Sequence, residues 1–243
     1  MSRRVGELSE VRSRRLNQRS DTRPARILAK ILCMTLFPAD RDSSGSSFAE
    51  VGDPVLAVAD KRRRMVAVAG AHEYDEAKTV GVFHVTDRAR RRWLLSSQYP
   101  VNAMAFHPTL PLLTVGSGEY DGGYHFEGEL LLVNLETGTT LSLIEHHLGR
   151  QILGLEWLNH QDLRVLMAPP DDWKDRKAHV EGHVAVVHRA DWTVVGAKSL
   201  TGRDLAGPRV PVPRPDHREA ARQAVARLVS PRTRRHHSNG THA

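Results

Sequence analysis

A pattern that returns after 46 residues is the feature of this sequence that most constrains its fold. Residues 55–59 and 66–75 align without a gap on residues 101–105 and 112–121. Identities at one fixed spacing are the signature of a repeat architecture, so we expect similar units placed side by side. The shared residues are Ala57 and Ala103, Ala59 and Ala105, Gly70 and Gly116, and the Glu-Tyr-Asp triplets that begin at Glu73 and Glu119.

A third, more divergent copy occupies residues 152–173. A second small motif supports it, because Glu127-Gly128 precedes one apolar run and Glu181-Gly182 precedes another. The repeated region therefore covers about residues 51–200. The predicted units are about 51–98, 99–147 and 150–200.

Each unit is expected to form four short strands, because short apolar runs alternate with turn residues. Four strands in about 45 residues are the size of one β-propeller blade. In the second unit the predicted strands are 101–106, 112–116, 129–135 and 140–144.

The second unit also resembles the WD40-like repeat family. Its segment Ala105-Phe106-His107-Pro108-Thr109-Leu110-Pro111 is similar to the first turn of that repeat, and Asn134-Leu135-Glu136-Thr137-Gly138 stands where the family has Trp-Asp-Leu-x-Thr-Gly. The chain departs from the family in lacking the Gly-His and Trp-Asp dipeptides. The resemblance implies an all-β fold, a partial β-propeller of three four-stranded WD40-like blades, and a role in protein binding.

Three blades leave the ends of the array uncovered, because closed propellers have at least four. Either residues 1–50 and 201–243 cap the ends, or several chains assemble through open blade edges, or the chain is a shortened propeller. We expect one of the last two.

The flanking segments are predicted from their composition. Residues 1–50 are basic and contain one amphipathic pattern at 27–37, which predicts a short helix, followed by a Ser-rich linker at 40–47. Lys30 interrupts the apolar run, which argues against a signal peptide. Residues 201–243 form a basic Pro/Arg-rich tail, mostly disordered or helical, with a predicted helix at Asp216–Val229 that starts from Asp216 as N-cap.

The net charge of +7 lies in these flanks. Residues 1–50 carry 10 basic and 6 acidic side chains, residues 201–243 carry 9 and 3, and residues 51–200 carry 16 and 19. The acidic middle argues against nucleic acid as the partner of the repeats and leaves only the tails for it. No apolar run reaches the roughly 20 residues of a membrane-spanning helix, and the only cysteine, Cys33, excludes an internal disulfide. We expect a cytoplasmic protein without membrane attachment.

Acidic and aromatic residues follow the second strand of each unit, so they are expected on one rim. Their carboxylates could bind a cation, a basic peptide or a polyhydroxylated ligand. Alternatively, the aspartates cap their own loops and the tyrosines pack between blades. This candidate acidic rim comprises Glu73, Tyr74, Asp75, Glu119, Tyr120, Asp121, Tyr124, Asp171, Asp172 and Trp173.

Basic residues replace the first and last turns of the first unit. Arg62, Arg63, Arg90 and Arg91 are expected on the rim opposite the acidic loops. They are either solvated turn residues or the contact surface for an anionic partner.

No metal, cofactor or catalytic motif is present in the sequence, so neither a cofactor nor a metal is expected. The predicted function is a non-enzymatic protein-interaction or scaffold module. One alternative is a propeller hydrolase or lactonase with a carboxylate-bound metal. Ala57, Ala59, Ala103 and Ala105 make the predicted inner strands apolar, which argues against that site. A second alternative is nucleic-acid binding through the basic tails.

Overall fold

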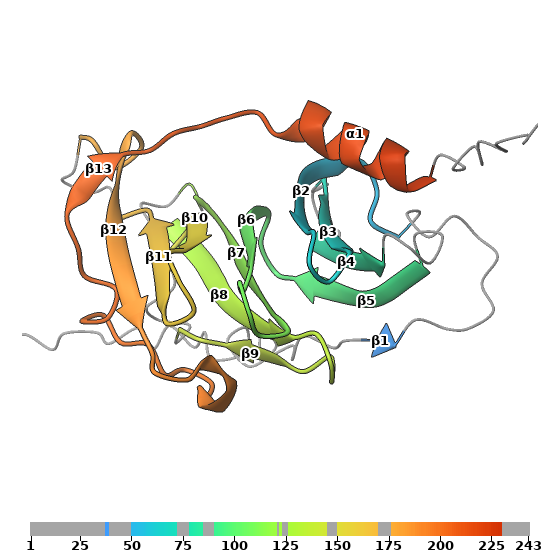
Figure 1. Ribbon diagram of the computed structural model, residues 1–243. Coiled ribbons are helices and arrows are strands. Elements are labelled where there is room, and N and C mark those ends of the chain that lie inside the picture. The colour runs from blue at the N-terminus through green and yellow to red at the C-terminus, as the bar shows by residue number, and fades with distance from the viewer. Residues whose placement is uncertain are drawn as a thin grey trace, which may run out of the picture. The chain divides into compact units, whose positions relative to one another are not determined.

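Three antiparallel sheets and one α-helix form in the part of the chain that the structure, a computed structural model, describes (Figure 1). The all-β fold expected from the sequence is therefore confirmed. All described positions but one dipeptide lie between residues 50 and 229, within a unit that spans Met34–Ala243. The described residues are 37–38, 50–71, 78–84, 90–120, 122, 126–144, 150–169 and 176–229.

In the first sheet each strand from β2 to β5 pairs with the next strand along the chain, and β1 adds to the outer edge of β5. The strand β3 is buried along its whole length, which explains its uninterrupted apolar sequence. The strands are β1 (Phe37–Pro38), β2 (Pro54–Asp60), β3 (Met65–Gly70), β4 (Lys78–His84) and β5 (Arg90–Ser97).

The second and third sheets repeat this order of pairing, with four strands each. The second consists of β6 (Val101–Phe106), β7 (Leu112–Tyr120), β8 (Phe126–Asn134) and β9 (Thr140–Ser142). The third consists of β10 (Ile152–Trp157), β11 (Asp162–Met167), β12 (Glu181–His188) and β13 (Arg209–Pro211), with a short 3-10 helix, η2 (Trp192–Val194), between its last two strands.

Neighbouring sheets pack through apolar faces. The strand β6 contacts both β2 and β10, so the first strands of the three sheets lie next to one another. One core, which includes Val82, Leu113 and Val133, lies between the first and second sheets, and another, which includes Leu130, Leu163 and Trp192, joins the second and third. Indole N–H groups reinforce both contacts, because Trp93 donates to the Leu135 carbonyl at 2.9 Å and Trp157 donates to the Ala105 carbonyl at 3.3 Å.

The strand register corrects the spacing of the repeat by one residue. Pro54 pairs with Gly70 and Leu56 with Ala69, while Val101 pairs with Ser117 and Ala103 with Gly116. Adding 47 (101 minus 54) to each residue number of the two pairs in the first sheet gives the two pairs in the second. The register of β2 and of β6 also shifts at equivalent positions. Because side chains alternate between the faces of a strand, the 46-residue alignment of identical residues joins positions on opposite faces.

Several boundaries differ from those expected. The strand β8 begins at Phe126 rather than at 129 and ends at Asn134, and β9 ends at Ser142 rather than at 144. Phe37, the last residue of the predicted N-terminal helix, lies in β1, and the rest of that helix is outside the described residues. The strand β7 continues through Glu119 to Tyr120, which were expected in a loop, because Tyr120 still pairs with Phe126. The longer pairing shortens the loop between the second and third strands of this sheet.

The C-terminal segment contributes two elements to the fold. Residues 209–211 pair with β12 as an edge strand, although they belong to the stretch assigned to the tail. Proline is tolerated there because an edge strand leaves one row of N–H groups unpaired. The predicted helix is confirmed as α1 (Arg218–Val229), whose first N–H group donates to Asp216 at 3.0 Å. Figure 1 shows the chain leaving β13 and running to α1, which contacts β2.

The helix α1 covers the outer face of the first sheet. Val66 and Val68 of β3 are buried in a cluster with Val51, and Val225 and Leu228 of the helix pack against it. On the exposed side, the guanidinium of Arg222 binds both carboxylate oxygens of Asp53, at 3.2 and 2.9 Å. The flanking C-terminal chain therefore caps the array at this end. This is the first of the three arrangements that the sequence left open.

Candidate functional sites at the two ends of the first sheet

The predicted basic residues gather at one end of the first sheet. Asp60 pairs with Met65, Met65 with His84, and His84 with Arg90, so these four residues form one row across the sheet. The turn at 61–64, with Arg62 and Arg63, therefore lies at the same end as Arg90 and Arg91. The last two are residues of β5 rather than of a turn. We call this end the basic end.

Arg63 and Arg91 are paired with carboxylates of the fold. Arg63 forms an ion pair with Asp60 and donates to the His107 carbonyl at 3.1 Å, and Arg91 forms an ion pair with Glu50. Burial raises the pKa of Asp60, but hydrogen bonds from the amide and guanidinium of Arg63 outweigh it and hold that pKa below its usual value. Asp60 and Glu50 are therefore already neutralised within the fold.

Other cations at the basic end are exposed to solvent. Arg62 donates to the Pro108 carbonyl at 3.5 Å, and Arg92 donates to the Leu135 carbonyl at 3.3 Å and lies 6.0 Å from the Trp93 ring. Lys61 and Arg64 are also exposed. Bonds to carbonyls leave the guanidinium charges uncompensated, so this surface keeps a positive potential.

Arg64 adopts a backbone conformation that disfavours a side chain. Its φ of 54° lies in the left-handed region, where glycine, asparagine or aspartate would be accommodated more readily. Strained residues of this kind are concentrated at functional sites. An arginine there lowers the stability of the turn and adds a cation to the surface.

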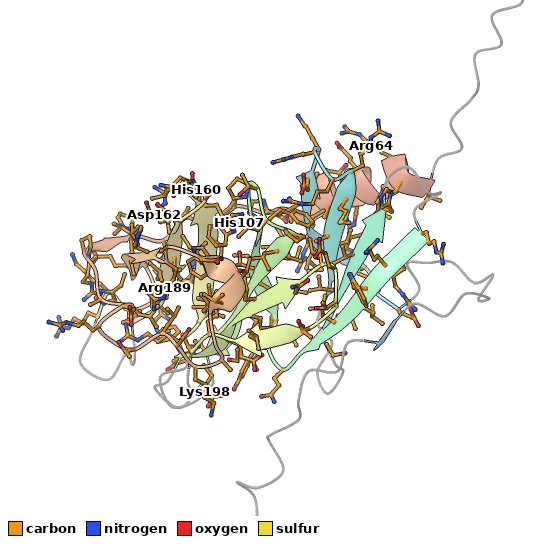
Figure 2. The ribbon with its side chains drawn as sticks, turned by 60° about the horizontal axis from the view of Figure 1, so that its bottom comes forward. Arg64, His107, His160, Asp162, Arg189 and Lys198 are labelled. Carbon is orange, nitrogen blue, oxygen red and sulfur yellow. The ribbon has the colours of Figure 1, made fainter. Side chains whose placement is uncertain are left out.

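Hydrogen bonds link the turns of the three sheets at this end. Besides the bond from Arg63, the Nε2 of His107 lies 3.0 Å from the His160 carbonyl oxygen of the third sheet. Figure 2 shows Arg64, His107 and His160 following one another along the same side of the molecule. The bonds hold the basic end in a fixed position relative to the neighbouring turns.

The opposite end carries the described part of the candidate acidic rim. Glu119 faces Glu127 across β7 and β8, and Glu127 accepts a hydrogen bond from the hydroxyl of Tyr99 at 3.0 Å. Burial and the nearby charges of Glu127, Glu129 and Glu119 raise the pKa of Tyr99, which keeps its hydroxyl protonated as a donor. This end is therefore rich in carboxylates, as the sequence suggested.

Tyr120 packs rather than standing alone at this end. Its ring lies 5.1 Å from that of Phe126 and 4.9 Å from that of His179, and the last two are 5.2 Å apart. Rings in mutual contact leave no gap for a ligand between them, which favours the packing role. The remaining predicted members lie outside the described residues: Glu73, Tyr74, Asp75, Asp121, Tyr124, Asp171, Asp172 and Trp173.

A cleft that the sequence did not predict opens at the end of the first sheet opposite the basic end, between β2, β6 and the segment before α1. Its volume is about 550 Å³. The sequence signal for it was the amphipathic spacing of Ala221, Val225 and Leu228, which shows that the C-terminal helix must pack on the fold. The lining residues are Val55, Leu56, Gly70, Ala71, Pro100, Val101, Asn102, Arg214, Pro215, Asp216, His217 and Arg218.

Searches for metal sites and membrane spans within the described ranges gave two negative results. No group of three or more His, Cys, Asp or Glu residues there is arranged to hold a metal ion. No helix in the same ranges is long and apolar enough to cross a membrane.

Comparison with known proteins identified no relative. No model of a known protein family matches the chain, and no curated protein sequence matches it.

Proposed function

We propose that this chain is a WD40-like partial β-propeller that acts as a non-enzymatic protein-interaction module in the cytoplasm, and that its basic end binds an acidic segment of a partner protein. The observation that carries the proposal is the separation of two kinds of cation. Arg63 and Arg91 neutralise the carboxylates of the fold, whereas Lys61, Arg62, Arg64 and Arg92 stand exposed beside them.

The arrangement of the sheets supports the propeller part of the proposal. Each of the three sheets contains a meander of four consecutive strands, and the first strands β2, β6 and β10 lie next to one another. Propeller blades have this order, with the first strand innermost. The common register of the first two sheets supports a repeat unit, at the corrected spacing.

The charge pattern favours an acidic protein segment as the partner. Exposed cations on a rigid surface attract carboxylates and select them over neutral or basic chains. Arg62 and Arg92 use some of their N–H groups on carbonyls within the fold, which orients the guanidinium groups before a partner arrives. The affinity should fall with salt because the surface is exposed.

The test measures binding of a fluorescein-labelled hexaglutamate peptide by fluorescence anisotropy. The variant Arg62→Glu/Arg64→Glu should bind it at least about tenfold more weakly than the parent, since two attractive contacts become repulsive. The control Lys198→Glu/Arg203→Glu changes the net charge equally at exposed positions between β12 and β13, outside the basic end, and it should retain most of the affinity.

Three results would overturn the proposal. The first is no binding of the peptide by the parent protein at low salt. The second is an equal loss in the control variant, which would show that only the net charge matters. The third is tighter binding of a single-stranded oligonucleotide of equal charge, which would favour the nucleic-acid alternative.

A further inference from the structure

The contact between the second and third sheets is equivalent to the contact between the first and second sheets at which the cleft opens. Its residues show how such a contact is closed. There the carbonyl of Gly118 accepts hydrogen bonds from the side-chain amides of Asn102 at 2.8 Å and Gln151 at 3.2 Å. Gly118 has a φ of +149°, and a Cβ on it would lie 2.5 Å from the Gln151 Cα. Two amide side chains and a glycine therefore close this contact tightly.

Backbone hydrogen bonds identify the equivalent residues between the first and second sheets. The amide of Gly118 donates to the Pro100 carbonyl and that of Ala168 to the Gln151 carbonyl, as the amide of Ala71 does to the Asp53 carbonyl. Ala71 thus corresponds to Gly118, and Pro100 corresponds to Gln151.

The register shifts in the first strands of the two sheets identify one more pair of equivalent residues. Val55 interrupts the register of β2 where Asn102 interrupts that of β6. The two amides that close the second contact are therefore replaced in the first by Val55 and Pro100, whose side chains carry no N–H group. The peptide carbonyl of Ala71 receives no side-chain amide from these two positions, and the cleft opens here.

The walls of the cleft combine apolar and cationic groups. Val55, Leu56 and Val101 supply an apolar surface, and the cations Arg214 and Arg218 come from the segment before α1 and its first residue. Arg214 also donates to the His179 carbonyl, so Arg218 is the cation considered for a ligand. The carboxylate of Asp216 is engaged, since it accepts the amide N–H of Arg218 at 3.0 Å. A ligand with an apolar part, an anionic group and an N–H donor would match all three features.

We propose that this cleft binds the C-terminal end of a partner polypeptide. The terminal carboxylate lies at Arg218, an apolar side chain packs on Val55 and Leu56, and a backbone N–H donates to the Ala71 carbonyl in place of the missing side-chain amides. The volume of about 550 Å³ is within the range of small-ligand sites. Capture of a terminal carboxylate is an established mode of peptide recognition.

The cleft is a second site, with its own chemistry, at the end of the first sheet opposite the basic end.

The experiment uses the full chain and a fluorescein-labelled Gly-Ala-Leu-Leu-Val peptide with a C-terminal carboxylate, compared with the same peptide as the amide. The acid should bind at least about tenfold more tightly than the amide, because a charge-assisted hydrogen bond is lost with the carboxylate.

Three variants locate the site. Arg218→Gln should reduce the affinity for the acid to that for the amide, whereas Arg203→Gln, a matched change outside the cleft, should leave both affinities unchanged. Val55→Asn/Pro100→Gln introduces the amides of the closed contact and should weaken both peptides. Thermal melting shows whether this double variant folds, and Arg218→Gln, at an exposed position, keeps the test decisive if it does not.

Equal binding of acid and amide, or an unchanged affinity in Arg218→Gln, would overturn the proposal. So would tighter binding of decanoate in competition with the peptide, which would assign the cleft to small amphiphilic acids. Hexaglutamate binding at the basic end, measured on the same variants, distinguishes these failures from a failure of the proposed function.

Discussion

At the scale of single residues, His107 shows how one side chain ties the turns together. It is 1% exposed, and its Nδ1 accepts the amide N–H groups of Thr109 at 3.1 Å and Leu110 at 2.9 Å. The ring proton must therefore sit on Nε2, which donates to the His160 carbonyl. The bonds to Thr109 and Leu110 are local to the turn, but the bond to the third sheet depends on how the sheets pack.

Protonation of His107 should destabilise the fold. Burial is the main cause that lowers its pKa, the bond to the His160 carbonyl opposes that shift, and the charges of Arg63 and His160 add to it. Because the unfolded chain then binds the proton more readily, His107 contributes stability above pH about 6.5 that is lost as the pH falls toward the lowered value.

The expected result is a melting temperature that decreases between pH 7.5 and 5.5 with a smaller slope in His107→Asn than in the parent. The asparagine should also lower the free energy of unfolding by about 1–2 kcal/mol at pH 7.5, since a buried hydrogen bond is lost. His160→Gln should change the slope much less than His107→Asn, because it removes only the smaller contribution of the His160 charge and keeps the backbone carbonyl that accepts the bond. An unchanged slope in His107→Asn would contradict this account.

At the scale of elements, α1 replaces a neighbouring sheet on the outer face of the first sheet. Val225 is half-buried against Val66 and Val68, and the adjacent Ala226 is exposed. The helix therefore stabilises the fold through one narrow apolar stripe.

We expect Val225→Asn to lower the free energy of unfolding by about 1–2 kcal/mol, because it loses half-buried apolar area. Ala226→Asn introduces the same side chain on the exposed side and should lower it by about 0.5 kcal/mol, through helix propensity alone. Urea denaturation followed by circular dichroism measures both. Equal effects at the two positions would mean that α1 does not pack on the sheet.

Individual strands were easier to predict from the sequence than their register. The strand at 101–106 was predicted with the observed bounds, because a short apolar run ends there at clear turn residues. The predicted repeat spacing of 46 residues was one residue too short, because the two units were aligned on their identical residues. Ala57 packs toward α1, whereas Met104, its true equivalent at an offset of 47, lies in the core shared with the first sheet.

At the scale of the whole molecule, several features cover the ends and edges of the three sheets. The segment around Leu200 runs along the second sheet, where the amides of Lys198 and Leu200 donate to the carbonyls of Ser142 and Leu143. Prolines flank and interrupt β13, which blunts the last edge. On the outer face of the third sheet, an ion pair links Arg164 to Glu156, and the Nδ1 of His188 lies 2.7 Å from the Asp162 carboxylate.

These features lead us to expect a monomer, although assembly through open blade edges was one of the two arrangements expected from the sequence. Light scattering coupled to size-exclusion chromatography should give a mass near 27.1 kDa that does not change with protein concentration. A dimer that persists on dilution would contradict this expectation and would point to the third sheet, where Val186 is 52% exposed.

The cleft and the cap could not be predicted from the sequence because both depend on contacts across more than 100 residues. Asp53 binds Arg222 of the predicted C-terminal helix, but nothing in the sequence indicates which sheet that helix contacts. The acidic and basic ends followed from strand order alone, since residues after a second strand and residues before it must lie at opposite ends of a sheet.

The segment between β13 and α1 also has a consequence for how the molecule comes apart. In a linear array each terminal repeat has one neighbour, so structure is lost first at the ends. Here the same short stretch of chain is anchored in the last sheet at one side and leads to the helix on the first sheet at the other. Because this segment joins the last sheet to the helix on the first sheet, local unfolding at either end of the array disturbs the other end. Unfolding of the three sheets should therefore be as cooperative as in a closed ring. A single cleavage between residues 212 and 217 would abolish this cooperativity.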